Sequence, residues 1–142
     1  MAKFQSVEDL VEATRPVNPV YCIREDSIGT SAAWFKNNFP GNILYAVKAN
    51  PNEKVLKTLL KNNITNFDTA TIEEIRLIKK IAPQAKVYFM HTIKSKESIS
   101  EAYFKYNVKD FSLDSKDELD KILKATNQAK DLTLYLRIQA SN

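Results

Sequence analysis

The feature that most constrains this chain is a strand-like run followed by a helix-start signal and an amphipathic helix, repeated four times and closed by a fifth run. The predicted strands cover residues 43–47, 65–69, 86–90, 109–113 and 132–138. Polar residues stand at or just after their ends at Lys48, Asp68, His91, Asp114 and Arg137, spaced 20, 23, 23 and 23 residues apart. Such spacing leaves room for a helix between successive strands, as parallel pairing requires. We therefore predict an α/β fold with about five parallel strands and intervening helices.

Helix-start signals follow the strands at regular positions. Thr71 and Ser115 are each followed three residues later by a glutamate, which is the spacing of a capping box. Ser95 is the cap candidate of the helix between them, and Asn50 is predicted to cap the first helix of the series, with Pro51 at its first position. The pattern thus predicts a helix after each of the first four strands.

Two architectures accept such repeats: an open doubly wound sheet, or part of an eight-stranded (β/α) TIM barrel. An open sheet needs both strand faces apolar, whereas the inner face of a barrel becomes polar toward its mouth. In the last strand Thr133, Tyr135 and Arg137 share one face, and the face of the third strand that carries Phe89 ends at His91. This pattern favours a partial barrel, because a complete one needs roughly 250 residues.

The segment before the repeats is predicted to be a separate extension. Residues 6–13 have the apolar spacing of a helix behind the cap candidate Ser6, and residues 19–23 are predicted to form a short strand that begins with a proline. We divide the chain into an N-terminal helix and strand extension, residues 1–24, and the N-terminal portion of a truncated barrel, residues 25–142.

Lys48 is the candidate nucleophile of the chain. It directly follows the apolar run, and strand alternation would place it on the same face as Leu44 and Ala46, with its stem packed and its amine at the strand mouth. A lysine that is desolvated in this way becomes a usable nucleophile toward aldehydes. The alternative is an ordinary lysine at a strand end, with its amine in water.

The other strand-end residues each have a functional and a structural interpretation. Arg137 on an inner strand face needs an anionic partner, and Asp68 is the partner we predict, although an aspartate there could equally support a turn. His91, the only histidine, could be catalytic or an ordinary packed or surface residue. Asp114 is predicted to be a helix-start residue favoured by the helix dipole.

Composition excludes several classes of function. The net charge of +4 comes from 21 basic and 17 acidic residues that alternate along the chain, so no nucleic-acid footprint is expected. Cys22 is the only cysteine, which excludes a disulfide framework and favours a reducing cytoplasm; no metal-binding motif is present. No run has membrane-spanning length, so no membrane partner is expected. Gly29 and Gly41 are the only glycines, and neither belongs to a phosphate-binding loop.

Several short blocks occur in the order of one known family. They are residues 19–21 (PVY), 45–50 (YAVKAN), 67–71 (FDTAT), 88–95 (YFMHTIKS), 111–115 (FSLDS) and 136–138 (LRI). With these blocks the chain resembles the N-terminal part of the pyridoxal phosphate-binding barrel of the ornithine/diaminopimelate/arginine decarboxylases, which share the fold of alanine racemase. The FDTAT block and the run from Tyr88 to Ser95 resemble bacterial ornithine or lysine/ornithine decarboxylases most.

The resemblance implies a site and an activity. Lys48 would carry pyridoxal 5'-phosphate as a Schiff base, and Asp68 and Arg137 would lie near the cofactor ring. The expected reaction is decarboxylation of a small-molecule amino acid, ornithine to putrescine or lysine to cadaverine, in polyamine biosynthesis. The family's phosphate loop and its second domain would lie beyond Asn142, so we expect a fragment that is inactive alone and a full-length homodimer. The alternative is a non-catalytic pyridoxal phosphate carrier or a decarboxylase-like regulatory protein.

Overall fold

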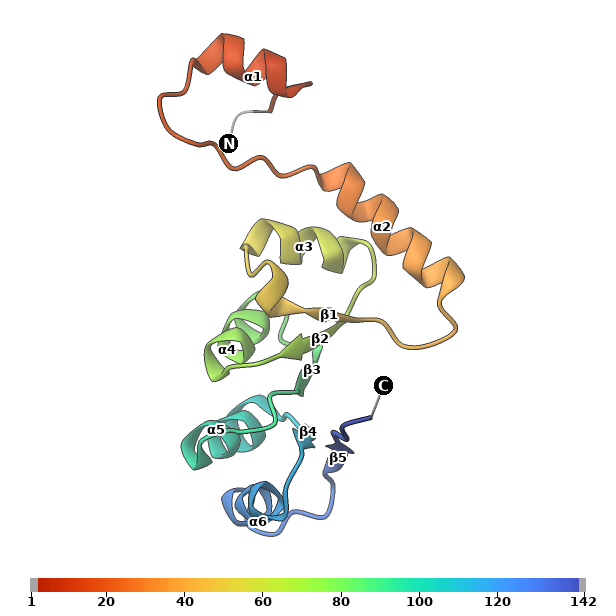
Figure 1. The fold of residues 1–142 in the computed structure, drawn as a ribbon, viewed down its shortest axis with the longest axis vertical. Coiled ribbons are helices and arrows are strands. Elements are labelled where there is room, and N and C mark those ends of the chain that lie inside the picture. Colours follow the sequence, from red (N-terminus) through yellow and green to blue (C-terminus); the bar gives the residue numbers. More distant parts are fainter. Residues whose placement is uncertain (1–2, 141–142) are drawn as a thin grey trace.

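The strands form one parallel sheet, and the helices that connect them cover one of its faces (Figure 1). The computed structural model describes residues 3–140. The elements are α1 (Val7–Thr14), α2 (Glu25–Asn38), β1 (Leu44–Ala46), a 3-10 turn η1 (Val47–Ala49), α3 (Glu53–Lys61), β2 (Asn66–Thr69), α4 (Ile72–Ile81), β3 (Lys86–Phe89), α5 (Lys96–Tyr106), β4 (Asp110–Leu113), α6 (Lys116–Ala125) and β5 (Thr133–Leu136). The strand order is β1-β2-β3-β4-β5, and every neighbouring pair is parallel. The predicted series of strands and helices is therefore confirmed.

The core lies between the sheet and helices α3 to α6. Phe67, Phe89 and Phe111 point from successive strands into this layer and are at most 2% exposed. They pack in one cluster with helix residues that include Ile78 and Ile122. Since alternate strand residues point to opposite faces, this layer uses only one face of the sheet. A sequential strand order with helices on one face is the barrel arrangement and excludes the doubly wound alternative.

The other face of the sheet carries a row of mostly polar residues. Strand register aligns Ala46, Asp68, Tyr88, Asp110 and Thr133 across the five strands. The prediction that Phe89 and His91 share the inner face of the third strand is wrong, because Phe89 faces the helices and Tyr88 occupies the inner row. His91 lies beyond the end of β3, so its polarity does not indicate which face of the strand is inner.

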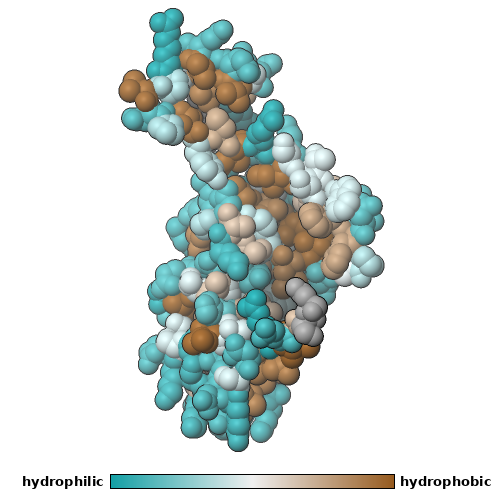
Figure 2. Space-filling model, viewed as in Figure 1, coloured by the Kyte–Doolittle hydropathy of each residue, from teal (hydrophilic) through white to brown (hydrophobic). Residues whose placement is uncertain are grey.

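Helix α2 packs at the β1 edge of the sheet. Ala32 of α2 forms a small buried cluster with Val55 and Leu59 of α3 and with Ile64. A largely apolar cavity of about 630 Å3 lies between α2 and β1. Figure 2 shows apolar side chains gathered in this region of the surface.

The N-terminal extension contains a helix but no strand. Helix α1 begins at the predicted cap, where Ser6 Oγ accepts a hydrogen bond from Asp9 N at 3.0 Å. The predicted strand over 19–23 is wrong, because that segment is irregular. Val20 and Tyr21 are 50% and 70% exposed, and an extended segment without a paired neighbour is not a stable strand.

We predict that Ile78→Ala lowers the free energy of unfolding by about 2–5 kcal/mol, because the side chain is fully buried and its removal leaves a cavity. The matched control is Ile93→Ala, since Ile93 is 68% exposed and should change stability little. Urea denaturation followed by circular dichroism measures both. Equal effects of the two substitutions would contradict the assigned core.

Candidate active site

Three of the predicted site residues come together at the carboxyl-terminal rim of the sheet. Asp68, in β2, is half-buried, and burial raises the pKa of its carboxyl group. The positive charges of Lys48 and Arg137 act on the same carboxyl group and oppose this increase. Both cations are therefore close enough to influence Asp68, although no ion pair joins it to either of them within residues 3–140.

Lys48 lies in the turn that follows β1, not in the strand. The 3-10 turn is closed by a hydrogen bond of 3.1 Å from Asn50 N to the carbonyl oxygen of Val47. Val47 is fully buried, whereas Lys48 is exposed. The prediction that its stem is packed and its amine desolvated is wrong for this chain, because strand alternation ends at Ala46 and the turn directs the side chain into solvent.

The start of α3 also differs from the prediction. The helix cap is Asn52, whose Oδ1 accepts from Lys54 N at 2.9 Å, so Asn50 is not the cap and Pro51 precedes the helix. Asn50 instead accepts from Asn52 N at 3.1 Å and donates to the hydroxyl of Tyr21 at 2.6 Å. The 3-10 turn occupies the residues in which the helix was expected to begin.

Arg137 directly follows β5 and is exposed. Its backbone N–H donates to the carbonyl oxygen of Leu113 at 2.8 Å, which keeps it aligned with β4. The prediction that its guanidinium is buried is wrong here, because β5 is an edge strand whose residues are all exposed.

Part of the inner face is filled by its own side chains. Tyr135 donates to Asp110 at 2.9 Å, and Lys86 forms an ion pair of 3.2 Å with the same carboxylate. Tyr88 and Tyr135 stack edge to face with ring centroids 6.2 Å apart. These contacts join β3, β4 and β5 on the inner face.

The two remaining strand-end residues are both exposed. His91 lies in the loop after β3, where its Nδ1 accepts a hydrogen bond of 3.1 Å from Ile93 N. Asp114 directly precedes Ser115, the cap of α6. A cavity of about 730 Å3 lies at the amino ends of β3 to β5, and none of the rim residues lines it.

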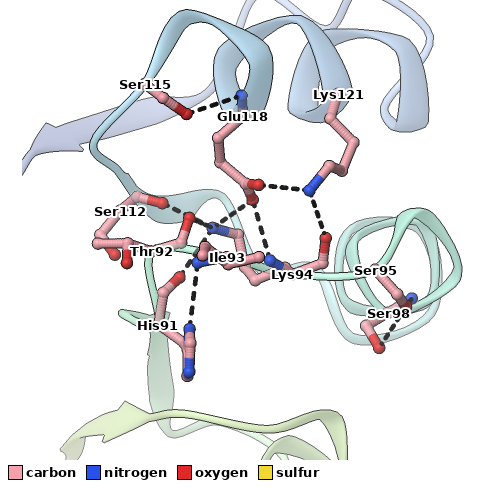
Figure 3. Close-up of polar contacts among 10 residues, drawn as sticks. All are labelled: His91, Thr92, Ile93, Lys94, Ser95, Ser98, Ser112, Ser115, Glu118 and Lys121. Carbon is pink, nitrogen blue, oxygen red and sulfur yellow. Dashed lines mark hydrogen bonds and ion pairs between the residues drawn. The ribbon is translucent and has the colours of Figure 1, made fainter.

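A buried ion pair at the rim had no signal in the sequence. Lys94 and Glu118 are 24 residues apart, yet Nζ and Oε1 lie 2.9 Å from each other, with side chains 0% and 3% exposed (Figure 3). Glu118 was expected to complete a capping box. Ser115 does accept from Glu118 N at 3.3 Å, but the Glu118 carboxylate binds Lys94 and Lys121.

The surroundings act differently on the two members of this pair. Burial raises the pKa of Glu118, but hydrogen bonds from Lys121 and Lys94 outweigh it, so the pKa lies below its ordinary value. Burial lowers the pKa of Lys94, and the interaction with Glu118 opposes this shift without reversing it. A carboxylate that accepts from two ammonium groups remains ionised at neutral pH.

Two absences limit the kinds of site that residues 3–140 can form. No group of three or more histidine, cysteine, aspartate or glutamate residues is placed there to hold a metal ion. Among the helices of the same residues, none combines the length and the apolar character that crossing a bilayer requires.

A partial (β/α) barrel with a lysine, a carboxylate and a guanidinium at its carboxyl-terminal rim defines a barrel-type domain, the class of fold that carries its active sites at this rim. A sequence profile of one family, described as "Pyridoxal-dependent decarboxylase, pyridoxal binding domain", matches residues 25–142. The chain belongs to this family, and the cofactor of its domain is pyridoxal 5'-phosphate. The expected resemblance is thereby confirmed.

Known relatives are decarboxylases of basic amino acids. The chain is 26% identical over 115 residues to the lysine/ornithine decarboxylase of Selenomonas ruminantium, covering 80% of this chain and 29% of that protein. The arginine decarboxylase of Paramecium bursaria Chlorella virus bound to agmatine superposes with a TM-score of 0.83 at 29% identity, covering 93% of this chain and 35% of that one. The lysine/ornithine decarboxylase of Vibrio vulnificus complexed with putrescine superposes with a TM-score of 0.78 at 30% identity, covering 94% of this chain and 37% of that one. The chain thus spans about a third of the length of these relatives.

The residues at the rim fit one end of the cofactor. Pyridoxal phosphate carries an aldehyde, and Lys48 offers an exposed amine whose charge acts on the Asp68 carboxyl group. Ala46, the register partner of Asp68, leaves space on the inner face because its side chain is a single methyl group.

We predict that Lys48→Met and Arg137→Met each raise the pKa of Asp68 further, because each removes a positive charge that now lowers it. The carboxyl carbon-13 shift of Asp68, followed by NMR against pH, measures the change. Lys57→Met is the control, since Lys57 pairs with Glu53 on the surface of α3. An Asp68 pKa unaffected by both rim substitutions would contradict the arrangement.

We predict that Glu118→Gln destabilises the fold by about 3–5 kcal/mol, because it leaves the Lys94 ammonium buried without a counter-charge. Urea denaturation at neutral pH measures the loss. Glu53→Gln, which removes only exposed ion pairs with Lys57 and Lys80, should have a much smaller effect.

The same pair predicts the direction of the pH dependence. The pKa of Glu118 is lowered in the folded chain. Its contribution to the stability of the fold is therefore fully present above the carboxyl pKa of the unfolded chain, and it is lost as the pH falls through the lower pKa of the folded chain. The difference in stability between the native chain and Glu118→Gln should therefore shrink in acid. A difference that grows as pH falls would contradict the assignment.

Proposed function

We propose that the protein containing this chain decarboxylates a basic amino acid, ornithine to putrescine or lysine to cadaverine, in polyamine biosynthesis in the cytoplasm. The observation that carries the proposal is the exposed Lys48 amine at the carboxyl end of β1, close enough to Asp68 for its charge to act on that carboxylate. The substrate class is supported by the relatives, which are named as lysine/ornithine and arginine decarboxylases.

The chain's own residues have distinct parts in this proposal. Bound pyridoxal phosphate supplies an electron sink for the pair released when the substrate carboxylate leaves as carbon dioxide. Lys48 holds the cofactor through its amine. Asp68 and Arg137, which carry opposite charges at the same rim, orient the cofactor ring.

We further propose how the protein is organised. Residues 1–24 form an extension, residues 25–142 form the N-terminal portion of the cofactor barrel, and the full-length protein is a homodimer, as the family resemblance implies. The 142-residue chain alone should hold the cofactor weakly and have no turnover. Lys48 is exposed in it, and its sequence contains no glycine-rich loop for the phosphate.

We predict that pyridoxal phosphate, trapped with borohydride in the protein expressed from its whole gene, labels Lys48 above all other lysines. Peptide mapping locates the label, and Lys48→Ala is the matched variant, in which the dominant label and carbon dioxide release should both disappear. In the 142-residue chain the label should be spread over several exposed lysines. Equal spreading in an active whole-gene protein would remove Lys48 from the proposal.

Substrate assays separate decarboxylation from the alternative. Carbon dioxide release is measured with ornithine, lysine, arginine and diaminopimelate. Diaminopimelate as the sole substrate would overturn the assignment to the ornithine and lysine enzymes. Labelling of Lys48 without release from any amino acid would favour the carrier or regulator.

A further inference from the structure

The loop between β3 and α5 is held by a buried ammonium group. Lys94 Nζ donates to the carbonyl oxygens of His91 at 2.9 Å and Ser112 at 2.6 Å, and it lies 2.9 Å from Glu118 Oε1, with a longer contact of 3.5 Å to Thr92 O. An ammonium has three protons, so the three short contacts use all of its donors. Lys94 is therefore unavailable to an aldehyde, and its function is to bind the loop.

Helix α6 holds the same loop from the other side. Glu118 Oε1 also accepts from Lys94 N at 3.2 Å, and Lys121 Nζ donates to the Lys94 carbonyl oxygen at 2.9 Å. The backbone and the side chain of Lys94 are thus both bonded to α6 (Figure 3).

Stability alone does not explain this ion pair. Removing two charges from water costs several kcal/mol per ion, and a well-packed apolar pair is often as stable or more stable. Apolar side chains, however, could not donate to the carbonyl groups of His91 and Ser112. The distinctive effect of Lys94 and Glu118 is that they specify the backbone path of the loop.

The residue that this path presents is His91. Its carbonyl is held by Lys94, and its Nδ1 accepts from Ile93 N, so the neutral ring carries its proton on Nε2. No residue within 3–140 accepts a hydrogen bond from Nε2. In Figure 3 the imidazole points away from the Lys94 cluster.

His91 lies at the same rim as Asp68. Met90 N donates to the carbonyl oxygen of Thr69 at 2.9 Å, which extends the pairing of β2 and β3 to the residue before His91. Thr69 in turn directly follows Asp68. A donor with no partner among residues 3–140 thus lies one strand away from Asp68, one of the residues assigned to the cofactor.

We propose that His91 binds pyridoxal phosphate by donating from Nε2 to an anionic oxygen of the cofactor, and that Lys94 and Glu118 are positioning residues that hold it there. This inference rests on the proposed function of the rim.

The test uses the protein expressed from its whole gene and pyridoxal phosphate as the probe. His91→Ala should weaken the Kd for pyridoxal phosphate about tenfold, the value of one hydrogen bond, and alter the visible absorption of the bound cofactor. His91→Gln, which keeps an N–H donor, should recover most of the affinity. The control Gln84→Ala, at the amino end of β3, should leave Kd unchanged. Unchanged binding by His91→Ala overturns the inference.

A double variant tests the positioning residues without an uncompensated charge. Lys94→Met combined with Glu118→Leu should fold, as circular dichroism would show, yet weaken Kd about as much as His91→Ala does. Adding His91→Ala to it should cause no further loss, because the residues act as one unit. Additive losses, or a double variant with native affinity, overturn the positioning role.

Borohydride labelling of Lys48 separates the two proposals. If Lys48 is labelled and His91→Ala binds the cofactor normally, only the inference about His91 fails. If Lys48 is not labelled, the proposed function and the inference are both overturned.

Discussion

The covering of one sheet face by helices α3 to α6 determines where the polar side chains of this domain lie. Burial of Phe67, Phe89 and Phe111 against those helices sends their strand neighbours to the opposite face, because consecutive strand residues alternate. Register then aligns Asp68 and Tyr88 across β2 and β3. The site is thus a consequence of hydrophobic packing on the other side of the sheet.

The inner face is occupied unevenly across its strands. On β3 to β5, Tyr88, Asp110 and Tyr135 fill the space through hydrogen-bonded and ring contacts. On β1 and β2 the same row continues with Ala46 and Asp68, and Asp68 is only half-buried. Parallel strands bring all their carboxyl ends to this one rim, which is why residues far apart in sequence can act on one ligand.

The rim combines rigid and exposed parts. The loop that carries His91 is bonded to β4 and α6 through Lys94 and Glu118, whereas Lys48 and Arg137 lie in exposed segments beside the two edge strands. An enclosed ammonium such as Lys94 is held for structure, and an exposed one such as Lys48 is accessible for chemistry. Burial therefore distinguishes Lys94, in the loop after β3, from Lys48, in the turn after β1.

The sequence by itself determined the order and type of the elements from β1 to β5. Apolar runs and capping residues such as Ser95, Thr71 and Ser115 are local signals, and all three cap the helices as expected. It also marked Lys48 and Asp68 through their positions at strand ends. Only the tertiary structure decided the exposure of Lys48, the absence of a strand over 19–23, and the pairing of Lys94 with Glu118. These depend on which elements meet in space, and the spacing of residues along the chain carries no information about that.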